Sequence, residues 1–533
     1  MKTEKILTLG LLCCSFNLFA AIMAEPKSET FYISPAGDDS NDGKSTRSPM
    51  KTWDKVFDKM DDGDNLMAMS GIWTDDPSYD CSQSAIQPCY NGLGARLDIS
   101  CVGLRYHLQD ISVSAVTSRA SMIRANGTAA LRLHTCDGWQ VDGLTLQSKD
   151  QSLARAATGN SVVTIIQSDS VELKNLLVLQ NNSLYDTDLV TFSASNNGLL
   201  EGSELYDFSN SGISVVNGSS GITTRGNYLH SRWYKVGGYD KDANGNEIIP
   251  EDKECIDFHQ TNGNTSENDI VVGCQGIRSS GSKNQILGSI VIDGDYAFRA
   301  APDCGTTGEP GCDVATNYPH SNVMQDVLAV RPLVSGIECD ASECFVKHAT
   351  VVDAQDAGYL VKDSNSQTGF VTDADITRAL VVSTIALAQN HSVGFELDGL
   401  STLTTTDVFA YFNDNNTDYL QGQFNYKGFG GSNHSGSKHQ LDPQVTCLLN
   451  LDEANSPVID ITSGQVGADL RFKYINGVKT TEKLFLANGN FAYCGAVIDG
   501  INGGSQTLYR YSCAGVKESL GTGVNGACTS QGM

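Results

Sequence analysis

The sequence predicts an all-β solenoid, and three observations support this. Short β-type segments recur about every 20–25 residues, which marks a stack of similar units rather than several globular domains. Apolar residues at helical spacing are nearly absent outside one short segment. The chain of 533 residues has 53 Gly, only 12 Pro and 18% charged residues, so much of the surface consists of turn-forming polar residues.

The repeats are clearest between residues 163 and 292. Each unit holds a short apolar strand, a polar turn and a second strand, and we take the small or polar residue before the second strand as an anchor. These anchor residues are separated by 27, 24, 41 and 21 positions, and the long step contains an insertion at about 234–253. The anchors are Asn175, Gly202, Gly226, Glu267 and Gly288. Stacking of such units buries one continuous core.

One helix is expected near the N-terminus. Trp53, Val56, Phe57 and Met60 follow an i, i+3, i+4, i+7 pattern, which predicts an amphipathic helix over 51–60. We interpret this helix as a cap that covers the exposed end of the coil stack.

Segment 1–24 has the features of a secretory signal. Lys2 and Lys5 precede an apolar run, and small residues follow at Ala20, Ala21 and Ala24, which predicts a secreted protein cleaved after Ala24. No later run is long and apolar enough to span a bilayer. Cleavage leaves 14 cysteines, an even number that favours disulfides in an exported protein. Four pairs are close in sequence: Cys81/Cys89, Cys304/Cys312, Cys339/Cys344 and Cys513/Cys528.

The charge balance excludes some partners. With 36 Lys+Arg against 62 Asp+Glu, the formal charge is -26, which disfavours nucleic acid and anionic membrane surfaces. An acidic polymer stays open as a ligand, because a local basic strip can lie within an acidic protein.

Both ends of the chain resemble secreted right-handed parallel β-helix proteins of the polysaccharide lyase type. The resemblance rests on FYISPAGDDSNDG at residues 31–43, Pro49, Thr52-Trp53 and DGD at 62–64. It rests also on LDP at 441–443, NSPVID at 455–460 and VGA at 466–468. It implies a right-handed parallel β-helix over 25–440 and a β-rich closing segment over 441–533. Lyases, epimerases, hydrolases and non-catalytic binders share this fold, so the fold alone does not give the chemistry.

A candidate site follows from strand alternation. If Ile213, Ile256, Ile277 and Phe298 point inward, the residues after them point outward and stack on successive coils. Those outward residues are Ser214, Asp257, Arg278 and Arg299, with His259 and Ser280 two residues further on and Glu254, Asp293 and Asp295 beside them.

These residue types suit an anionic sugar. Arginine binds carboxylates bidentately, and β-elimination beside a uronate carboxylate needs a cation to stabilise the developing charge. The resemblance implies that Arg278 assists proton transfer, that Arg299 holds a carboxylate, and that Glu254 and Asp257 bind calcium. The related enzymes carry a Lys on the preceding strand, and this sequence has none there, so His259 is an alternative base. A neutralised ladder of charges without catalysis is the other interpretation.

A second calcium candidate lies in the insertion. Residues 240–251 fit the pattern D-x-[DN]-x-[DN]-G-x5-E, with Asp240, Asp242, Asn244 and Glu251 as ligands. The alternative is a simple hairpin turn at Asn244-Gly245.

The sequence therefore predicts a monomeric, secreted lyase that cleaves a uronate-containing, acidic polysaccharide by calcium-assisted β-elimination. A non-catalytic glycan-binding or adhesion protein on the same scaffold is the main alternative. A glycoside hydrolase, which needs two carboxylates about 5–10 Å apart, is a third.

Overall fold

The computed structural model describes the chain from residue 28 to residue 523, with gaps. The described ranges are 28–101, 108–126, 129–149, 161–181, 188–208, 210–231, 234–235, 238–239, 254–302, 319–352, 354–361, 373–383, 393–397, 402–406, 409–412, 433–435, 438–439, 467–484, 496–498, 506–511 and 517–523. The expected signal segment 1–24 lies outside them.

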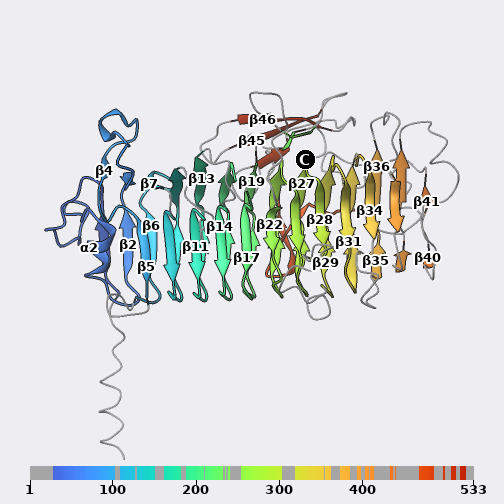
Figure 1. Cartoon of the computed structure of the whole chain (residues 1–533), viewed down its shortest axis with the longest axis horizontal. Coiled ribbons are helices and arrows are strands. Elements are labelled where there is room, and N and C mark those ends of the chain that lie inside the picture. Colours follow the sequence, from blue (N-terminus) through green and yellow to red (C-terminus); the bar gives the residue numbers. More distant parts are fainter. Residues whose placement is uncertain are drawn as a thin grey trace, which may run out of the picture.

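Three long parallel sheets form the body of the protein, which confirms the all-β parallel β-helix (Figure 1). Sheet A consists of β1 (Thr30–Ile33), β2 (Asn65–Ala68), β6 (Ser112–Ala115), β9 (Gln140–Asp142), β12 (Glu172–Lys174), β15 (Leu199–Glu201), β18 (Thr223–Arg225), β23 (Thr265–Glu267), β26 (Gln285–Leu287), β29 (Val323–Gln325), β32 (Cys344–Lys347), β35 (Asp373–Thr377), β38 (Thr402–Thr406) and β40 (Asn433–Ser435).

Sheet B consists of β4 (Cys89–Asn91), β3 (Gly71–Thr74), β7 (Ser121–Asn126), β10 (Leu144–Lys149), β13 (Leu177–Asn181), β16 (Glu204–Tyr206), β19 (Tyr228–His230), β24 (Ile270–Val272), β27 (Ile290–Ile292), β30 (Leu328–Val330), β33 (Thr350–Val352), β36 (Leu380–Ser383), β39 (Phe409–Phe412) and β41 (Lys438–His439). Sheet C consists of β5 (Leu97–Ser100), β8 (Leu131–His134), β11 (Val163–Ile166), β14 (Val190–Ser193), β17 (Ile213–Val216), β22 (Glu254–Phe258), β25 (Gly276–Ser279), β28 (Tyr296–Ala300), β31 (Ser335–Cys339), β34 (Ala357–Val361) and β37 (Val393–Leu397).

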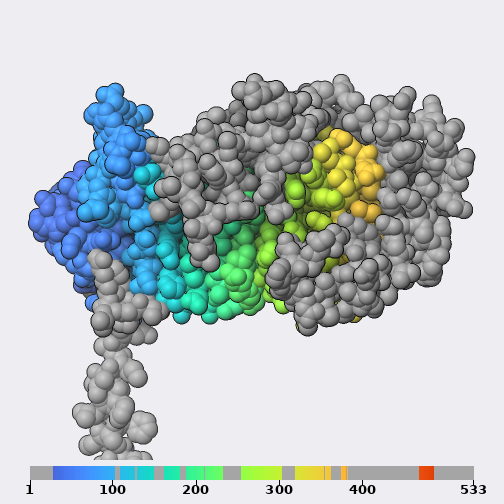
Figure 2. All heavy atoms as spheres, viewed as in Figure 1, coloured from blue at the N-terminus to red at the C-terminus, as the bar shows by residue number. Residues whose placement is uncertain are grey.

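Each regular coil contributes one strand to each sheet in the order A, B, C, so sequence neighbours become neighbours in space. Figure 2 shows this directly, because the colours of the described residues change steadily along the long axis. Inward residues of every coil stack into one apolar core; Leu146, Val178, Leu205, Leu229, Val271 and Val291, for example, are all fully buried on sheet B. Most bends from sheet A to sheet B need one residue with positive φ, such as Asn175 or Gly226. Asparagine and glycine adopt this conformation more readily than other residues.

The expected N-terminal helix is present but shorter. Helix α2 spans Trp53–Phe57 and lies at the N-terminal end of the stack (Figure 1). Its buried face packs on the first coils, with ring centroids 5.2 Å apart for Trp53 and Trp73 and 5.6 Å apart for Phe57 and Trp139. A single turn of 3₁₀ helix, η1, spans Cys81–Gln83.

Four disulfides are found among the described residues. Cys81–Cys89 and Cys339–Cys344 confirm two of the close pairs, and Cys101–Cys136 and Cys255–Cys274 link more distant cysteines. The other two predicted pairs, Cys304/Cys312 and Cys513/Cys528, lie outside the described residues. No helix in the described ranges has the length and apolarity needed to cross a membrane.

Shorter antiparallel sheets follow or interrupt the coils. They are β20 (Tyr234–Lys235) with β21 (Gly238–Tyr239), β42 (Phe472–Ile475) with β43 (Val478–Lys483), and β44 (Ala496–Ile498) with β45 (Gln506–Tyr511) and β46 (Lys517–Gly523).

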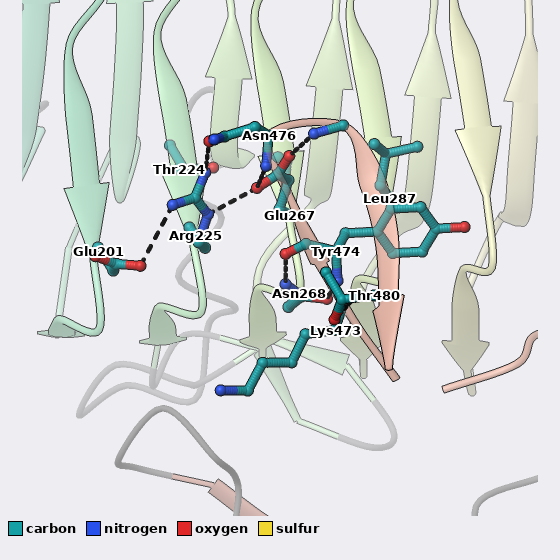
Figure 3. Close-up of polar contacts among 12 residues, drawn as sticks. Glu201, Thr224, Arg225, Glu267, Asn268, Leu287, Lys473, Tyr474, Asn476 and Thr480 are labelled. Atoms are coloured by element: carbon teal, nitrogen blue, oxygen red, sulfur yellow. Dashed lines mark hydrogen bonds and ion pairs between the residues drawn. The ribbon is translucent and has the colours of Figure 1, made fainter. Parts of the chain in front are cut away.

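The β42–β43 hairpin docks on the coils beside sheet A through polar contacts (Figure 3). The backbone N–H of Tyr474 donates to Asn268 Oδ1 at 2.9 Å, and Asn268 Nδ2 donates to Tyr474 O at 2.7 Å. The fully buried carboxylate of Glu267 accepts from Arg225 Nε at 2.7 Å and from the backbone of the hairpin turn. These hydrogen bonds join the hairpin to Asn268 and Glu267 at defined atoms, so they fix the position of the hairpin along the coils.

A second carboxylate fixes the base of the same hairpin. Asp326 is buried and accepts from the hydroxyl of Tyr474 at 2.5 Å and from Lys479 Nζ at 2.9 Å. It also accepts from the backbone N–H of Asp469 at 2.9 Å. The hairpin therefore supplies the donors for two buried carboxylates of the coils.

Candidate functional site

The row of outward residues predicted on sheet C is present in the predicted register. Ser214 pairs with Asp257, Asp257 with Arg278, and Arg278 with Arg299 on strands β17, β22, β25 and β28. The residues expected to point inward are at most 1% exposed: Ile213, Ile256, Ile277 and Phe298. The two equal steps, from Asp257 to Arg278 and from Arg278 to Arg299, thus each correspond to one whole coil.

The row extends by one residue that the sequence did not reveal. Glu338 on β31 pairs with Arg299 in register, although the chain between them is much longer than in the preceding coils. It includes segment 303–318, outside the described residues, and this extra length hides the repeat. The row therefore reads Asp257, Arg278, Arg299, Glu338 on four successive coils, and we call these four residues the charged row.

Both arginines of the charged row have a carboxylate partner. Arg278 Nη1 lies 2.9 Å from Oε1 of Glu254, and Arg299 Nε lies 3.2 Å from Oε1 of Glu338. Arg278, Glu254 and Glu338 are all more than nine-tenths buried. Ion pairs in such surroundings hold their side chains firmly, because leaving either charge without its partner costs several kcal/mol.

Arg299 is the more accessible arginine. Its side chain is 23% exposed, against 10% for Arg278. Its guanidinium lies over the ring of Tyr296, with the central carbon 4.8 Å from the ring centroid. Within the described residues its two terminal Nη groups form no hydrogen bond, so they can bind an added carboxylate.

Asp257 and His259 face each other on the outer side of β22. Asp257 Oδ2 lies 3.4 Å from Nδ1 of His259, whose side chain is 39% exposed. A carboxylate at Nδ1 favours the tautomer with the proton on Nδ1 and leaves Nε2 as the acceptor. The other oxygen, Asp257 Oδ1, is buried and has no hydrogen-bond partner among the described residues.

The flanking acidic residues have different roles. The carboxylate of Asp293 accepts two hydrogen bonds from the guanidinium of Arg331, at 2.6 and 2.7 Å. The two residues lie at bends of adjacent coils. Both side chains are buried, so this bidentate pair joins two coils beside the charged row. Asp295 is also buried. Ser280 is 1% exposed, and its hydroxyl accepts from the backbone N–H of Gln260 at 2.8 Å.

The calcium ligands predicted in the insertion lie outside the described residues: Asp240, Asp242, Asn244 and Glu251. In the part of the chain that is described, no three His, Cys, Asp or Glu side chains gather as a metal ion would need. Asp257 Oδ1 offers one oxygen ligand, whereas Glu254 is engaged with Arg278. Calcium binding stays a prediction that depends on the 240–251 loop.

The solved structures that are similar to this chain include the following three carbohydrate-active enzymes. No family model matches the sequence, and no curated protein matches it. A PL6 family polysaccharide lyase from Pseudopedobacter saltans is 13% identical with a TM-score of 0.44, over 79% of this chain and 95% of that one. A PL6 alginate lyase in complex with a trisaccharide is 9% identical with a TM-score of 0.48, over 86% and 92%.

The third is the catalytic unit of a GH87 α-1,3-glucanase from Streptomyces thermodiastaticus strain HF3-3. It is 11% identical with a TM-score of 0.42, over 78% of this chain and 71% of that one. Since all three TM-scores are below 0.5, none of these likenesses assigns a substrate or a reaction to this chain.

Proposed function

We propose that this protein is a carbohydrate-active enzyme that cleaves a uronate-containing polysaccharide by β-elimination on the outer face of sheet C. The observation that carries the proposal is the juxtaposition of the Asp257–His259 pair with the two arginines of the charged row on consecutive coils. It brings a base and two fixed cations onto one face, which are the groups that this chemistry requires.

His259 is the base in this proposal. Guanidinium groups stay protonated in proteins, so neither Arg278 nor Arg299 can accept the proton. His259 Nε2 removes the proton from the carbon beside the uronate carboxylate, and the electron pair left behind forms the new C=C bond. The C–O bond at the neighbouring carbon breaks, and its oxygen takes a proton from water to become the end of the released sugar chain, while His259 returns the proton it removed to the solvent.

The arginines stabilise the charge that develops on the carboxylate. Arg299 holds the carboxylate of the sugar, because its Nη groups form no hydrogen bond within the described residues and an aromatic ring supports it. Arg278 is fixed by Glu254 next to Asp257 and supplies a second positive charge whose position does not change during the reaction. This division gives Arg299 a role in binding and Arg278 a role in turnover.

The non-catalytic alternative is favoured by one specific observation. Because Glu254 and Glu338 pair the two arginines, the row is close to neutral, as a purely structural ladder would be. A protein built this way would bind a glycan weakly at Arg299 without cleaving it.

The test is an absorbance screen for unsaturated uronate products across alginate, pectate, ulvan and glycosaminoglycans. We expect product from at least one polymer, and loss of product in His259→Gln with binding retained. His134→Gln is the matched control, because His134 lies on the same face of sheet C several coils away. Binding without product from any polymer supports the non-catalytic alternative, and neither binding nor product overturns both.

A further inference from the structure

The hairpin and the adjoining strand of sheet A gather cations in a protein of charge -26. Segment 467–484 carries four Lys or Arg residues against two acidic ones. Lys347, at the end of β32, adjoins the hairpin, because its carbonyl accepts from the backbone N–H of Asp326 at 3.0 Å while the Asp326 side chain binds Lys479. Cations of two chain segments that are distant in sequence therefore meet here.

Two aromatic rings that are not fully buried belong to the same two segments. Phe472 has Lys483 Nζ 4.4 Å and the guanidinium carbon of Arg471 5.7 Å from its ring centroid. Phe345 is 42% exposed and lies two residues before Lys347 on the same face of β32. We call this surface the hairpin patch; its residues are Phe345, Lys347, Arg471, Phe472, Lys473 and Lys483.

Three carboxylates near the patch are paired with its cations or with Lys479. Asp326 is buried and paired with Lys479, Asp469 is paired with Arg471 and Lys479, and Glu482 is paired with Lys473. Asp375, beside Phe345 in register, is an exposed acidic residue at its edge. Within the described residues, Lys347 and Lys483 are the two cations of the patch that no carboxylate pairs.

We propose that the hairpin patch is a second binding surface for an anionic, carboxylate-bearing polysaccharide, separate from the sheet C face. Ring faces pack against the C–H faces of sugar rings, and the surrounding cations bind the carboxylates. The side chain of Lys473, drawn in Figure 3, is 16% exposed, and its Nζ lies 3.4 Å from Oε2 of Glu482.

The charged groups around His348 include three cations of this region and one carboxylate. Burial lowers the pKa of His348, and the charges of Lys347, Arg378 and Lys479 lower it further, against the opposing effect of Asp326.

We favour a polysaccharide over a nucleic acid as the partner because of the acidic charge of the protein and because of the two phenylalanine rings. A nucleic acid carries a charge at every phosphate, so a long strand would meet the acidic remainder of the protein. A carboxylated polysaccharide offers apolar sugar faces to Phe345 and Phe472, which a phosphate backbone does not. The proposal does not depend on catalysis at sheet C.

The test measures binding of polygalacturonate as the probe at low salt. Lys347→Gln/Lys483→Gln changes two exposed side chains, and we expect roughly three- to tenfold weaker binding with an unchanged melting temperature. The matched control is Lys55→Gln/Lys59→Gln at the N-terminal end of the stack, which changes the net charge equally and should bind like the wild type. Raising the salt concentration should remove the difference, because exposed charges are screened.

Arg299→Ala separates this surface from the sheet C site. In the Arg299→Ala background, the Lys347→Gln/Lys483→Gln change should still weaken binding by the same factor. Equal binding by the patch variant and the control, or equal binding of a neutral dextran and polygalacturonate by the wild type, would overturn the patch whatever the outcome at sheet C.

Discussion

Tyr474 and Asn268 exchange two hydrogen bonds, so that the side-chain amide of a coil residue pairs with the backbone of the C-terminal hairpin. Asn268 holds φ at 57° in the bend between sheets A and B, a conformation that asparagine tolerates better than most residues. One residue thus makes the turn and anchors a segment 206 positions further along the chain.

Replacing Asn268 by Gly should release the hairpin. Glycine keeps the positive φ but removes both bonds, which we expect to cost about 1–3 kcal/mol of the free energy of unfolding. Limited proteolysis should cut within 467–484 faster than in the wild type. Asn175→Gly is the matched control, since Asn175 occupies the equivalent bend of an earlier coil, and it should leave proteolysis of the hairpin unchanged.

The register of the coils was predictable because the steps from Asp257 to Arg278 and from Arg278 to Arg299 are equal and no insertion intervenes. Glu338 was missed because extra chain length separates it from Arg299 and breaks the regular spacing. The Glu254–Arg278 pair was missed for a different reason. A bulge between Glu254 and Ile256 breaks the alternation of faces, so counting by twos from Ile256 does not indicate where Glu254 points.

The docking of the hairpin could not be predicted from local patterns at all. Its contacts join Asn268 to Tyr474 and Glu267 to Asn476, residues more than 200 positions apart. Nothing in the spacing of either segment encodes such a pairing. The resemblance at 466–468 indicated a closing segment but gave no contact.

The buried carboxylate of Asp269 should make stability depend on pH. Burial raises its pKa to about 6, although Thr224, Asn227 and Ser266 all donate hydrogen bonds that act in the opposite direction. The folded state therefore binds the proton more tightly than the unfolded state. The contribution of this group is fully present below about pH 4 and is lost as the pH rises through about 6, a change on the order of 3 kcal/mol.

Asp269→Asn isolates that contribution. The difference in unfolding free energy, wild type minus variant, should fall between pH 4 and pH 7 in urea titrations. A difference that stays constant across this range would show that Asp269 does not titrate there. Because other carboxylates are common to both proteins, their titrations cancel in the comparison.

The 240–251 loop should bind calcium if the sequence pattern is functional. Binding to the folded state alone raises stability by about 2.7 kcal/mol at a hundredfold excess of calcium over the dissociation constant. Thermal melts with calcium and with chelator should then differ, and Asp240→Ala/Glu251→Ala should reduce the difference. Wild-type melts that coincide under both conditions would remove the prediction for this loop.

Arg278 should be needed for both stability and turnover, and the two effects can be separated. Arg278→Ala removes the partner of Glu254, which is only 3% exposed, so we expect a loss of about 3 kcal/mol as well as loss of product formation. The double variant Arg278→Ala/Glu254→Gln also removes the buried negative charge that Arg278 balanced and should recover most of the stability.

The double variant decides between catalysis and a structural ladder. If Arg278 stabilises the developing charge, the double variant stays inactive on an accepted polymer even though it is folded, since no cation remains at that position. Arg278→Lys should recover stability in part but turnover poorly, because an ammonium lacks the bidentate fork. Arg299→Ala should mainly raise KM, since Arg299 is the exposed binding group. Wild-type kcat in the double variant would instead show that the Glu254–Arg278 pair only holds two coils together.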